Sequence, residues 1–486
     1  MTACLHWFRD DLRLADNPAL SEALSRGPTL CIYILDREGD RRRLGGASCW
    51  WLSRSLKALG DAIDEKGGTL LVFEGDPGDL VPMIADAIGA GHVTWNRRYE
   101  GREVKLDKAV KARLEESGLS VTSCNAHLLH EPWTVTTKAG TPMKVFTPFW
   151  RAARALGEPG EAKSAPRTMK APPVTAAVRK LALAHGDLGL EPTKPDWAGG
   201  LREAWTPGED GAADKLSHFL ASIAGYAEGR ERPDKPATSQ LSPHLRFGEI
   251  GPRQIWQAVQ FARHAGEHKM PAGDVERFET ELGWREFSHH VLFHSEDLSK
   301  VNVNRRFDAF PWRADARALK AWQRGMTGYP IVDAGMRQLW STGWMHNRVR
   351  MIVASFLVKH LLIDWRDGEA WFWDTLVDAD PGNNPMNWQW VAGSGADAAP
   401  YFRIFNPVTQ GQKFDPRGAY VREWVPEIAD LPDKFVHAPW TASSEVLSKA
   451  KLALGKAYPK PIVDLDAGRE RALAALREMN AARSGE

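Results

Sequence analysis

The N-terminal part of the chain alternates short apolar runs with longer amphipathic stretches. Four short runs are rich in apolar and β-branched residues and predict strands at 5–8, 30–35, 69–73 and 92–95. Stretches between them, such as 47–66 and 77–88, have the spacing of amphipathic helices. Strands that alternate with helices are typical of a parallel sheet with helices on both faces. We therefore expect an α/β domain over residues 1–133.

The pattern becomes helical after residue 201. Apolar positions recur at helical spacing in seven stretches, at 214–229, 250–265, 274–293, 314–325, 331–342, 349–362 and 368–377. The intervening segment 134–200 is rich in Pro, Ala, Gly and Lys, which is typical of an interdomain linker. The sequence thus predicts a larger all-helical domain over 201–486, with no internal repeats.

Composition narrows the class of protein. The chain has 486 residues, 43% hydrophobic and 26% charged, as in ordinary soluble proteins, but its 21 tryptophans are unusually many. A net charge of +1 argues neither for nor against nucleic acid. The four cysteines lack CxxC spacing, so we expect no metal site. No signal peptide or membrane-length apolar run is visible, so a cytoplasmic location, nucleoid-associated if bacterial, and no membrane contact are expected.

Several clusters could carry chemistry. The run TSQLS at 238–242 precedes a predicted helix, where its hydroxyls would either cap the helix or cradle a phosphate. Neither a GxGxxG sequence after the first strand nor a Walker sequence is present. On the helix predicted for 274–293, Glu281, Trp284 and Arg285 share a face, which fits either a site or a surface ion pair beside a core tryptophan.

A second helix face combines Asn347, Arg350 and Met351, at positions i, i+3 and i+4. An amide and a thioether cannot serve as general acids, so this face would not suit a reaction that needs proton transfer. The run DADPGNNPMNWQW at 378–390 places two aspartates and two asparagines ahead of tryptophans. That run could equally be a plain polar turn.

Together these motifs resemble the photolyase/cryptochrome family. The resemblance extends from WFRDDLRL at 7–14, through TSQLS and WMHNRVRM at 344–351, to NWQWVAGSG at 387–395 and YFRIFNP at 401–407, and ends near residue 440. Family members that repair (6-4) photoproducts carry a histidine pair where this chain has Asn347 and Met351. The chain therefore resembles the branch that repairs cyclobutane pyrimidine dimers.

The resemblance implies non-covalent, reduced FAD as cofactor. In it, Asp378 pairs with Arg350 beside the flavin ring, Asp380 accepts from the ring imide, and Asn384 faces the N5 edge. An arginine held by a carboxylate would supply positive charge to a flavin anion. The implied cofactor-binding residues are Tyr226, Arg230, Thr238, Ser239, Gln240, Leu241, Ser242, Phe278, Glu281, Arg285, Asn347, Arg350, Asp378, Asp380 and Asn384.

The same resemblance implies DNA containing cyclobutane dimers as partner of a monomeric chain. Trp284 and Trp390 would form the aromatic walls of a pocket for a flipped dimer. The implied DNA-binding residues are Arg230, Trp284, Arg348, Met351, Trp390 and Arg403. The implied catalytic residues are Glu281, Asn347 and Met351, together with an electron relay of Trp388, Trp365 and Trp312, each of which alone could be a core residue.

Glu103 and Lys300 resemble antenna contacts of related enzymes, although Arg102 departs from the asparagine of some folate binders. We expect methenyltetrahydrofolate there, with a deazaflavin or a second flavin as alternatives and solvated charges as the plain reading. The leading function is light-driven repair of cyclobutane dimers. The alternative is a cryptochrome photoreceptor, disfavoured by the retained Trp284, Met351 and Trp390 and by the short segment after the helical domain. A flavin oxidoreductase that does not act on DNA is disfavoured because no nicotinamide fingerprint is visible.

Overall fold

The computed structural model describes residues 2–37, 42–184, 188–266, 269–398 and 402–481. The chain forms two compact units. Unit 1 comprises residues 1–224 and 239–295, and unit 2 comprises residues 225–238 and 296–486. Unit 1 therefore contains the first helices of the predicted helical domain, whose boundary at residue 201 stays a prediction.

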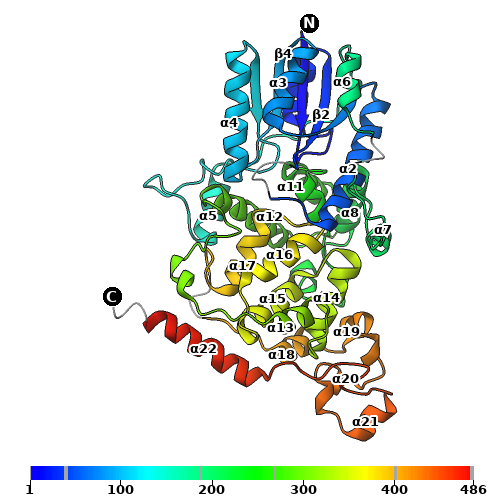
Figure 1. Ribbon diagram of the computed structural model, residues 1–486, viewed down its shortest axis with the longest axis vertical. Helices are drawn as coiled ribbons and strands as arrows, with labels where there is room; N and C mark the ends of the chain where they lie inside the picture. Colours follow the sequence, from blue (N-terminus) through cyan, green and yellow to red (C-terminus); the bar gives the residue numbers. More distant parts are fainter. Residues whose placement is uncertain (1, 38–41, 185–187, 267–268, 399–401, 482–486) are drawn as a thin grey trace. The chain divides into compact units, whose positions relative to one another are not determined.

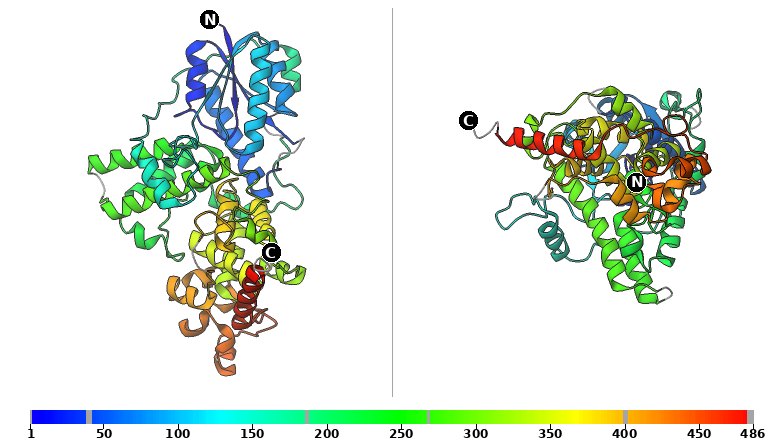
Figure 2. Two further views of the ribbon diagram at one scale, coloured as in Figure 1. Left: turned by 90° about the vertical axis from the view of Figure 1, so that its left-hand side faces the viewer. Right: turned by 90° about the horizontal axis from the view of Figure 1, so that it is seen from below.

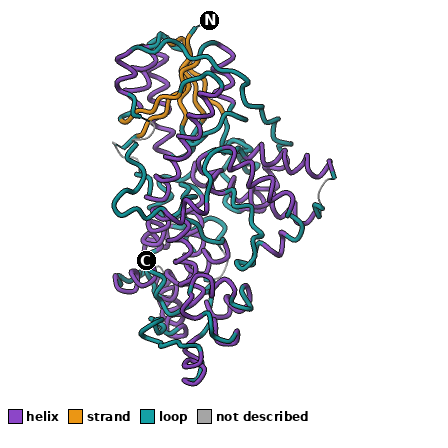
Figure 3. Tube along the Cα trace, turned by 90° about the vertical axis from the view of Figure 1, so that its right-hand side faces the viewer, coloured by secondary structure: helices purple, strands orange, loops and turns teal. Residues whose placement is uncertain are grey.

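Unit 1 contains a five-stranded sheet in which every pairing is parallel (Figures 1 and 3). The strands are β1 (Ala3–Phe8), β2 (Thr29–Leu35), β3 (Leu70–Glu74), β4 (Ala90–Asn96) and β5 (Ser120–Cys124), in the order β3-β2-β1-β4-β5. The four predicted strands are confirmed. The edge strand β5 was missed because its sequence, SVTSC, is mostly polar and only partly buried.

Helices cover both faces of this sheet (Figure 2). They are α1 (Pro18–Arg26), α2 (Gly46–Glu65), α3 (Pro77–Ala87) and α4 (Gly101–Glu116). Helix α3 packs against α4, and α1 packs against β1 and β4. The sheet core buries strand residues such as Leu5, Ile32 and Val93, all fully enclosed. Burial on both faces explains the nearly continuous apolar runs of these strands, and the predicted α/β fold is confirmed.

The described residues of unit 1 form seven further helices. They are α5 (Phe146–Ala155), α6 (Ala176–Leu181), α7 (Gly199–Ala204), α8 (Glu209–Ala221), α10 (Ser242–Phe247), α11 (Pro252–Ala265) and α12 (Ala272–Phe293). The predicted linker thus contains α5, α6 and the start of α7. The single helix predicted for 214–229 is wrong, because α8 ends at Ala221 and Gly225, at φ +87°, precedes a separate short helix.

Helices are the main secondary structure among the described residues of unit 2. Its elements are α9 (Tyr226–Gly229), η1 (Arg305–Ala309), α13 (Ala316–Gln323), α14 (Pro330–Thr342), α15 (Asn347–Ser355), η2 (Phe356–His360), α16 (Trp365–Thr375), α17 (Asn383–Ala392), α18 (Pro407–Phe414), α19 (Ala419–Trp424), η3 (Pro426–Ile428), α20 (Asp433–Val436), η4 (Pro439–Thr441), α21 (Ser444–Lys449) and α22 (Leu465–Ala481).

The core of unit 2 is unusually aromatic. Trp322, Phe356, Trp365 and Trp388 lie in one hydrophobic cluster, and none is more than 2% exposed. The helix predicted for 349–362 is present as α15 followed by the π-helical turn η2. Among the described residues, none of the helices is long and apolar enough to span a bilayer.

A buried carboxyl holds the segment that follows β5. Glu286, on α12, accepts hydrogen bonds through Oε2 from the backbone N–H groups of Leu129 (2.9 Å) and His130 (3.2 Å). Burial raises the pKa of Glu286 from 4.5 to about 7. Between these two pH values the folded protein binds more protons than the unfolded chain at this position. The contribution of Glu286 to stability therefore falls as pH rises through this window.

We predict that Glu286→Gln removes this pH dependence. A glutamine keeps an acceptor for the two backbone donors but has no charge to desolvate. The melting temperature of the variant minus that of the native protein should therefore be larger at pH 8 than at pH 5. Both are measured by thermal unfolding followed by circular dichroism. The same difference in melting temperature at pH 5 and pH 8 would contradict this role of Glu286.

Candidate active site

Helix α15 presents the residues that the sequence singled out most clearly. It begins at Asn347, and the preceding His346 caps it by accepting from the Arg348 backbone N–H through Nδ1, at 3.2 Å. Desolvation, as the largest effect, lowers the pKa of His346 to about 4. This histidine is therefore neutral near pH 7. Asn347, Arg350 and Met351 all lie in the first two turns of α15, which begins two residues before the helix predicted for 349–362.

The ion pair predicted between Arg350 and Asp378 is present. Arg350 Nη2 lies 2.8 Å from Asp378 Oδ2, and the Asp378 side chain is only 4% exposed. Arg350 Nε also donates to the carbonyl of Met345 at 2.7 Å. These bonds fix the guanidinium at the start of α15 and tie it to the segment that follows α16.

Asp380 and Asn384 lie at the start of α17. Asp380 Oδ1 accepts from the backbone N–H groups of Gly382 (2.9 Å) and Asn383 (2.6 Å), and so shapes the turn into this helix. Asn384 Nδ2 donates to Glu369 Oε1 at 2.9 Å and to its carbonyl at 3.1 Å. Glu369, a buried residue of α16 that the sequence analysis missed, thus fixes the orientation of the Asn384 amide.

A second missed carboxylate connects two predicted arginines. Glu231 Oε2 accepts from Arg348 Nε at 2.7 Å, and Glu231 Oε1 lies 3.7 Å from Arg230 Nη1. Arg230 is 7% exposed, and its guanidinium lies 5.8 Å from the ring centre of Tyr226. Glu231 therefore brings these two predicted ligands into one charged cluster.

The three tryptophans of the predicted relay share one hydrophobic cluster. Trp365 and Trp388 are buried in it, and Trp312 packs against it. Gly368, one turn after Trp365, has no room for a Cβ because the Trp388 ring lies directly over it. Trp365 Nε1 donates to Asn302 Oδ1 at 3.0 Å. The relay itself stays a prediction.

Trp390 and Arg403 lie near each other in unit 2. The Arg403 guanidinium is 6.0 Å from the Trp390 ring centre, and Trp390 Nε1 donates to the Asp397 carbonyl at 3.1 Å. Tyr401, the first residue of the motif that contains Arg403, lies outside the described residues. An aromatic ring beside a guanidinium is a suitable surface for nucleotides.

Helix α12 carries the predicted ligands of unit 1. Trp284 is half-buried and stacks face to face on Phe146, with ring centres 3.7 Å apart. Phe278 is buried against Phe219. Glu281 Oε1 lies 3.4 Å from Arg277 Nη2, with which it forms an ion pair one turn away on the same helix.

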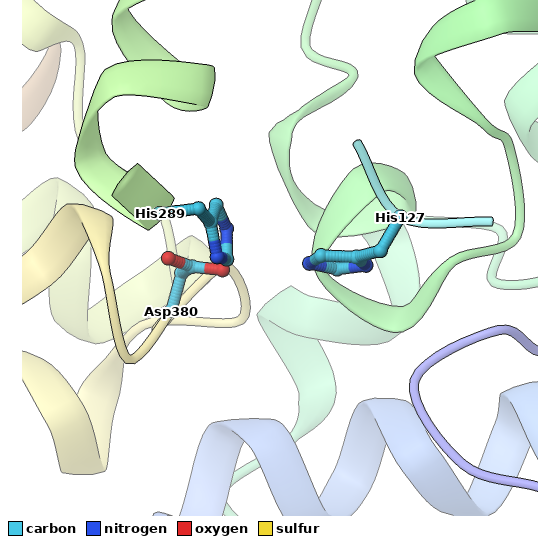
Figure 4. A group of neighbouring side chains, drawn as sticks. All are labelled: His127, His289 and Asp380. Atoms are coloured by element: carbon cyan, nitrogen blue, oxygen red, sulfur yellow. The ribbon is translucent and has the colours of Figure 1, made fainter. Parts of the chain in front are cut away.

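Arg285, also on α12, contacts His127. It donates to the His127 carbonyl at 2.7 Å and lies 2.9 Å from His127 Nε2. Figure 4 shows His127 beside His289, and their rings meet edge to face at 4.8 Å; the third labelled residue, Asp380, belongs to unit 2. A role for Arg285 beside a cofactor stays a prediction.

The geometry of the run 238–242 bears on whether its hydroxyls cap a helix or cradle a phosphate. Helix α10 starts at Ser242 and its N-cap is Leu241, whose side chain makes no capping bond. Ser242 is therefore not a helix cap. Gln240 adopts a left-handed conformation (φ +51°) and accepts from Lys215 Nζ at 2.6 Å. Thr238 belongs to unit 2 and the rest of the run to unit 1, and its phosphate-binding role stays a prediction.

The two predicted antenna residues are both engaged in ion pairs. Glu103, in α4, is 5% exposed and pairs with Arg98. Lys300 is exposed and lies 3.5 Å from Asp297. Glu103 belongs to unit 1 and Lys300 to unit 2, so a shared antenna site stays a prediction.

The described side chains of unit 2 fit the flavin ring chemically. Arg350 offers a positive charge that Asp378 holds in place, and Asn384 offers an amide that Glu369 orients. The Asp380 carboxylate accepts from its own turn through Oδ1, and a carboxylate can accept further bonds, such as one from an imide N–H. These are the groups that a flavin pyrimidine edge requires.

Comparison with known proteins decides the family. The DNA photolyase family model matches residues 4–171, and the model for the FAD binding domain of DNA photolyase matches residues 278–478. The deoxyribodipyrimidine photo-lyase of Agrobacterium fabrum is 53% identical over 472 residues, which cover 96% of each chain. The chain belongs to the DNA photolyase family.

Other members of the DNA photolyase family are also similar to this chain over nearly its whole length. A crystal structure of a bacterial class III photolyase from Agrobacterium tumefaciens matches with a TM-score of 0.94 and 51% identity, over 99% of this chain and 98% of that one. Cryptochrome-2 of Arabidopsis thaliana is 39% identical over 477 residues, which cover 96% of this chain and 77% of that protein. The predicted family and the presence of an FAD-binding domain are confirmed.

The relay predicts a specific loss on substitution. Trp365→Phe and Trp388→Phe should each slow the photoreduction of oxidised FAD severalfold or abolish it, because phenylalanine is much harder to oxidise than indole. The measurement is flavin absorbance during blue illumination with an external reductant. Trp256→Phe, which changes a buried tryptophan of unit 1, serves as the matched control. Normal photoreduction in both relay variants would reject the assignment of Trp365 and Trp388.

Proposed function

We propose that this protein is a light-dependent deoxyribodipyrimidine photo-lyase that repairs cyclobutane pyrimidine dimers in DNA. The observation that carries the proposal is the arrangement on helix α15. This one rigid element carries Arg350, fixed by Asp378 for the cofactor, and Asn347, Arg348 and Met351 for the substrate. The family relationship supplies the reaction, and α15 supplies the groups that it needs.

Reduced FAD, when bound, supplies an electron on absorbing blue or near-ultraviolet light and takes it back after the dimer's two ring bonds have broken. Arg350 would hold positive charge beside the flavin through its bond to Asp378. Asp380 and Asn384 would orient the ring through their fixed oxygen and amide groups. Tyr226, Arg230 and the run 238–242 would hold the rest of the cofactor.

The lesion class follows from the proton chemistry of α15. Splitting a cyclobutane ring needs only electrons, whereas repair of a (6-4) product also needs a proton donor. Asn347 and Met351 cannot donate one. The neighbouring His346 has a pKa of about 4 and is neutral near pH 7. This site therefore suits the cyclobutane dimer.

The remaining substrate contacts are proposed for aromatic and basic side chains. Trp284 and Trp390 would stack on the flipped pyrimidines, because exposed base faces bind aromatic rings. Arg230, Arg348 and Arg403 would contact phosphates. Glu103 and Lys300 would bind an antenna chromophore, for which methenyltetrahydrofolate is favoured. The protein would act as a monomer.

A blue-light photoreceptor is the alternative function. The 39% identity to Cryptochrome-2 is the observation that supports the photoreceptor function. The higher identity to a photo-lyase and the presence of Trp284, Met351 and Trp390 favour repair.

We predict that the purified protein contains non-covalent FAD, released on denaturation. After chemical reduction, it should restore intact thymines in an oligonucleotide with one cyclobutane dimer under blue light, and not in the dark. The products can be quantified by chromatography. Undamaged oligonucleotide and the oxidised protein provide the controls. Bound flavin with light responses but no repair would favour the photoreceptor function instead.

A further inference from the structure

A basic cleft lies within unit 2, at the end of α15 that carries Arg348. Its volume is about 570 Å³, and its lining includes four cationic side chains: Arg348, Arg403, Lys413 and Arg469. They come from α15, from the segment before α18, from α18 and from α22. No carboxylate is present among the described residues that line it. Glu231, which lies outside this lining, bonds to Arg348, but the cationic side chains outnumber that carboxylate, so the cleft attracts anions.

Aromatic side chains complete the walls of the cleft. Phe414 lies beneath Arg348, with the guanidinium carbon 4.4 Å from the ring centre. Phe402 and Phe405 line the cleft as well. Guanidinium groups interleaved with aromatic rings are typical of surfaces that bind the backbone and bases of a nucleic-acid strand.

Arg469 is the member of this set that neither the sequence motifs nor the family relationship pointed to. It is exposed on α22, and within the described part of the chain no carboxylate pairs with it or with Lys413. Helix α22 is packed firmly against the body of unit 2. Gly468, next to Arg469, allows close contact, because a Cβ there would lie 3.1 Å from His360 Cα.

Two further contacts hold α22 in place. Arg471 donates to the His360 carbonyl at 2.7 Å. Ala472, Ala475 and Met479 are buried in one cluster with Phe307 and Phe310. The backbone that carries Arg469 is therefore fixed before any ligand binds, and binding orders only the side chain.

We propose that Arg469 contacts a phosphate of the lesion-bearing DNA strand, so that the C-terminal helix α22 forms part of the DNA-binding surface. The proposal rests on the proposed function, which places Arg348 and Arg403 at the same strand. The ligand chemistry is a phosphodiester, which carries no sequence information. Arg469 would therefore add affinity without changing which lesion is repaired.

The salt dependence of binding tests this assignment. A fluorescent duplex with one cyclobutane dimer, and the same duplex undamaged, are titrated with the full-length protein in the dark, from about 50 to about 400 mM KCl. Losing one phosphate contact lowers the slope of log K against log salt by about 0.9. We expect this drop for Arg469→Gln on both duplexes. Near 0.1 M salt, the affinity should fall about five- to tenfold.

Two variants make the test specific. Arg477→Gln removes another exposed arginine of α22, one that does not line the cleft, and should leave the slope unchanged. Arg469→Lys keeps the charge and should retain the native slope. Equal slopes for Arg469→Gln and Arg477→Gln would overturn the proposal, as would a loss in Arg469→Gln that Arg469→Lys does not restore. A native protein that fails to prefer the damaged duplex would reject the proposed function instead, while the slope on either duplex still reports on Arg469.

Discussion

The ion pair between Arg350 and Asp378 is the constraint on which the rest of the site depends. It joins the first turn of α15 to the segment after α16, with a carboxylate that is almost completely buried. Removing Arg350 would leave the buried carboxylate of Asp378 without compensation, whereas Arg350 itself is 24% exposed and can still be reached by water. Together with the His346 cap, the pair holds the first turn of α15, which carries Asn347 and Arg348.

The same helix also holds the segment that carries Arg403. At its π-helical end, Lys359 is fully buried, donates to the Ala392 carbonyl at 2.7 Å and lies 3.1 Å from the Phe402 ring centre. Desolvation lowers the pKa of Lys359 well below its usual value. Ser355 Oγ accepts from the Phe405 backbone N–H at 3.1 Å. Local π-helical geometry is common at functional sites. Here Ser355 and Lys359, at the two ends of the π-helical turn, both contact the segment 402–405.

Much of this arrangement could be predicted from the sequence, because it depends on local pattern or on motifs. The strands β1 to β4 are apolar runs bounded by helical stretches, and α15 follows from the spacing of Asn347, Arg350 and Met351. The pairing of Arg350 with Asp378 came from the family resemblance.

The residues that were missed act through contacts between distant segments. Glu231 and Glu369 look like ordinary surface carboxylates in the sequence, and Lys215 and Lys359 like ordinary lysines. Their partners lie 15 to 117 residues away along the chain. The break between α8 and α9 was missed because helical periodicity continues across a single glycine, Gly225, whose left-handed conformation interrupts the helix.

Helix α15 offers a lesion positive charge but no general acid. The most direct measurement compares two otherwise identical oligonucleotides, one with a cyclobutane thymine dimer and one with a (6-4) product, incubated with the reduced protein under the same blue light. The account predicts restored thymines from the cyclobutane dimer and unchanged (6-4) product from about pH 6 to pH 8, since His346 stays neutral over that range. Repair of the (6-4) product would contradict it.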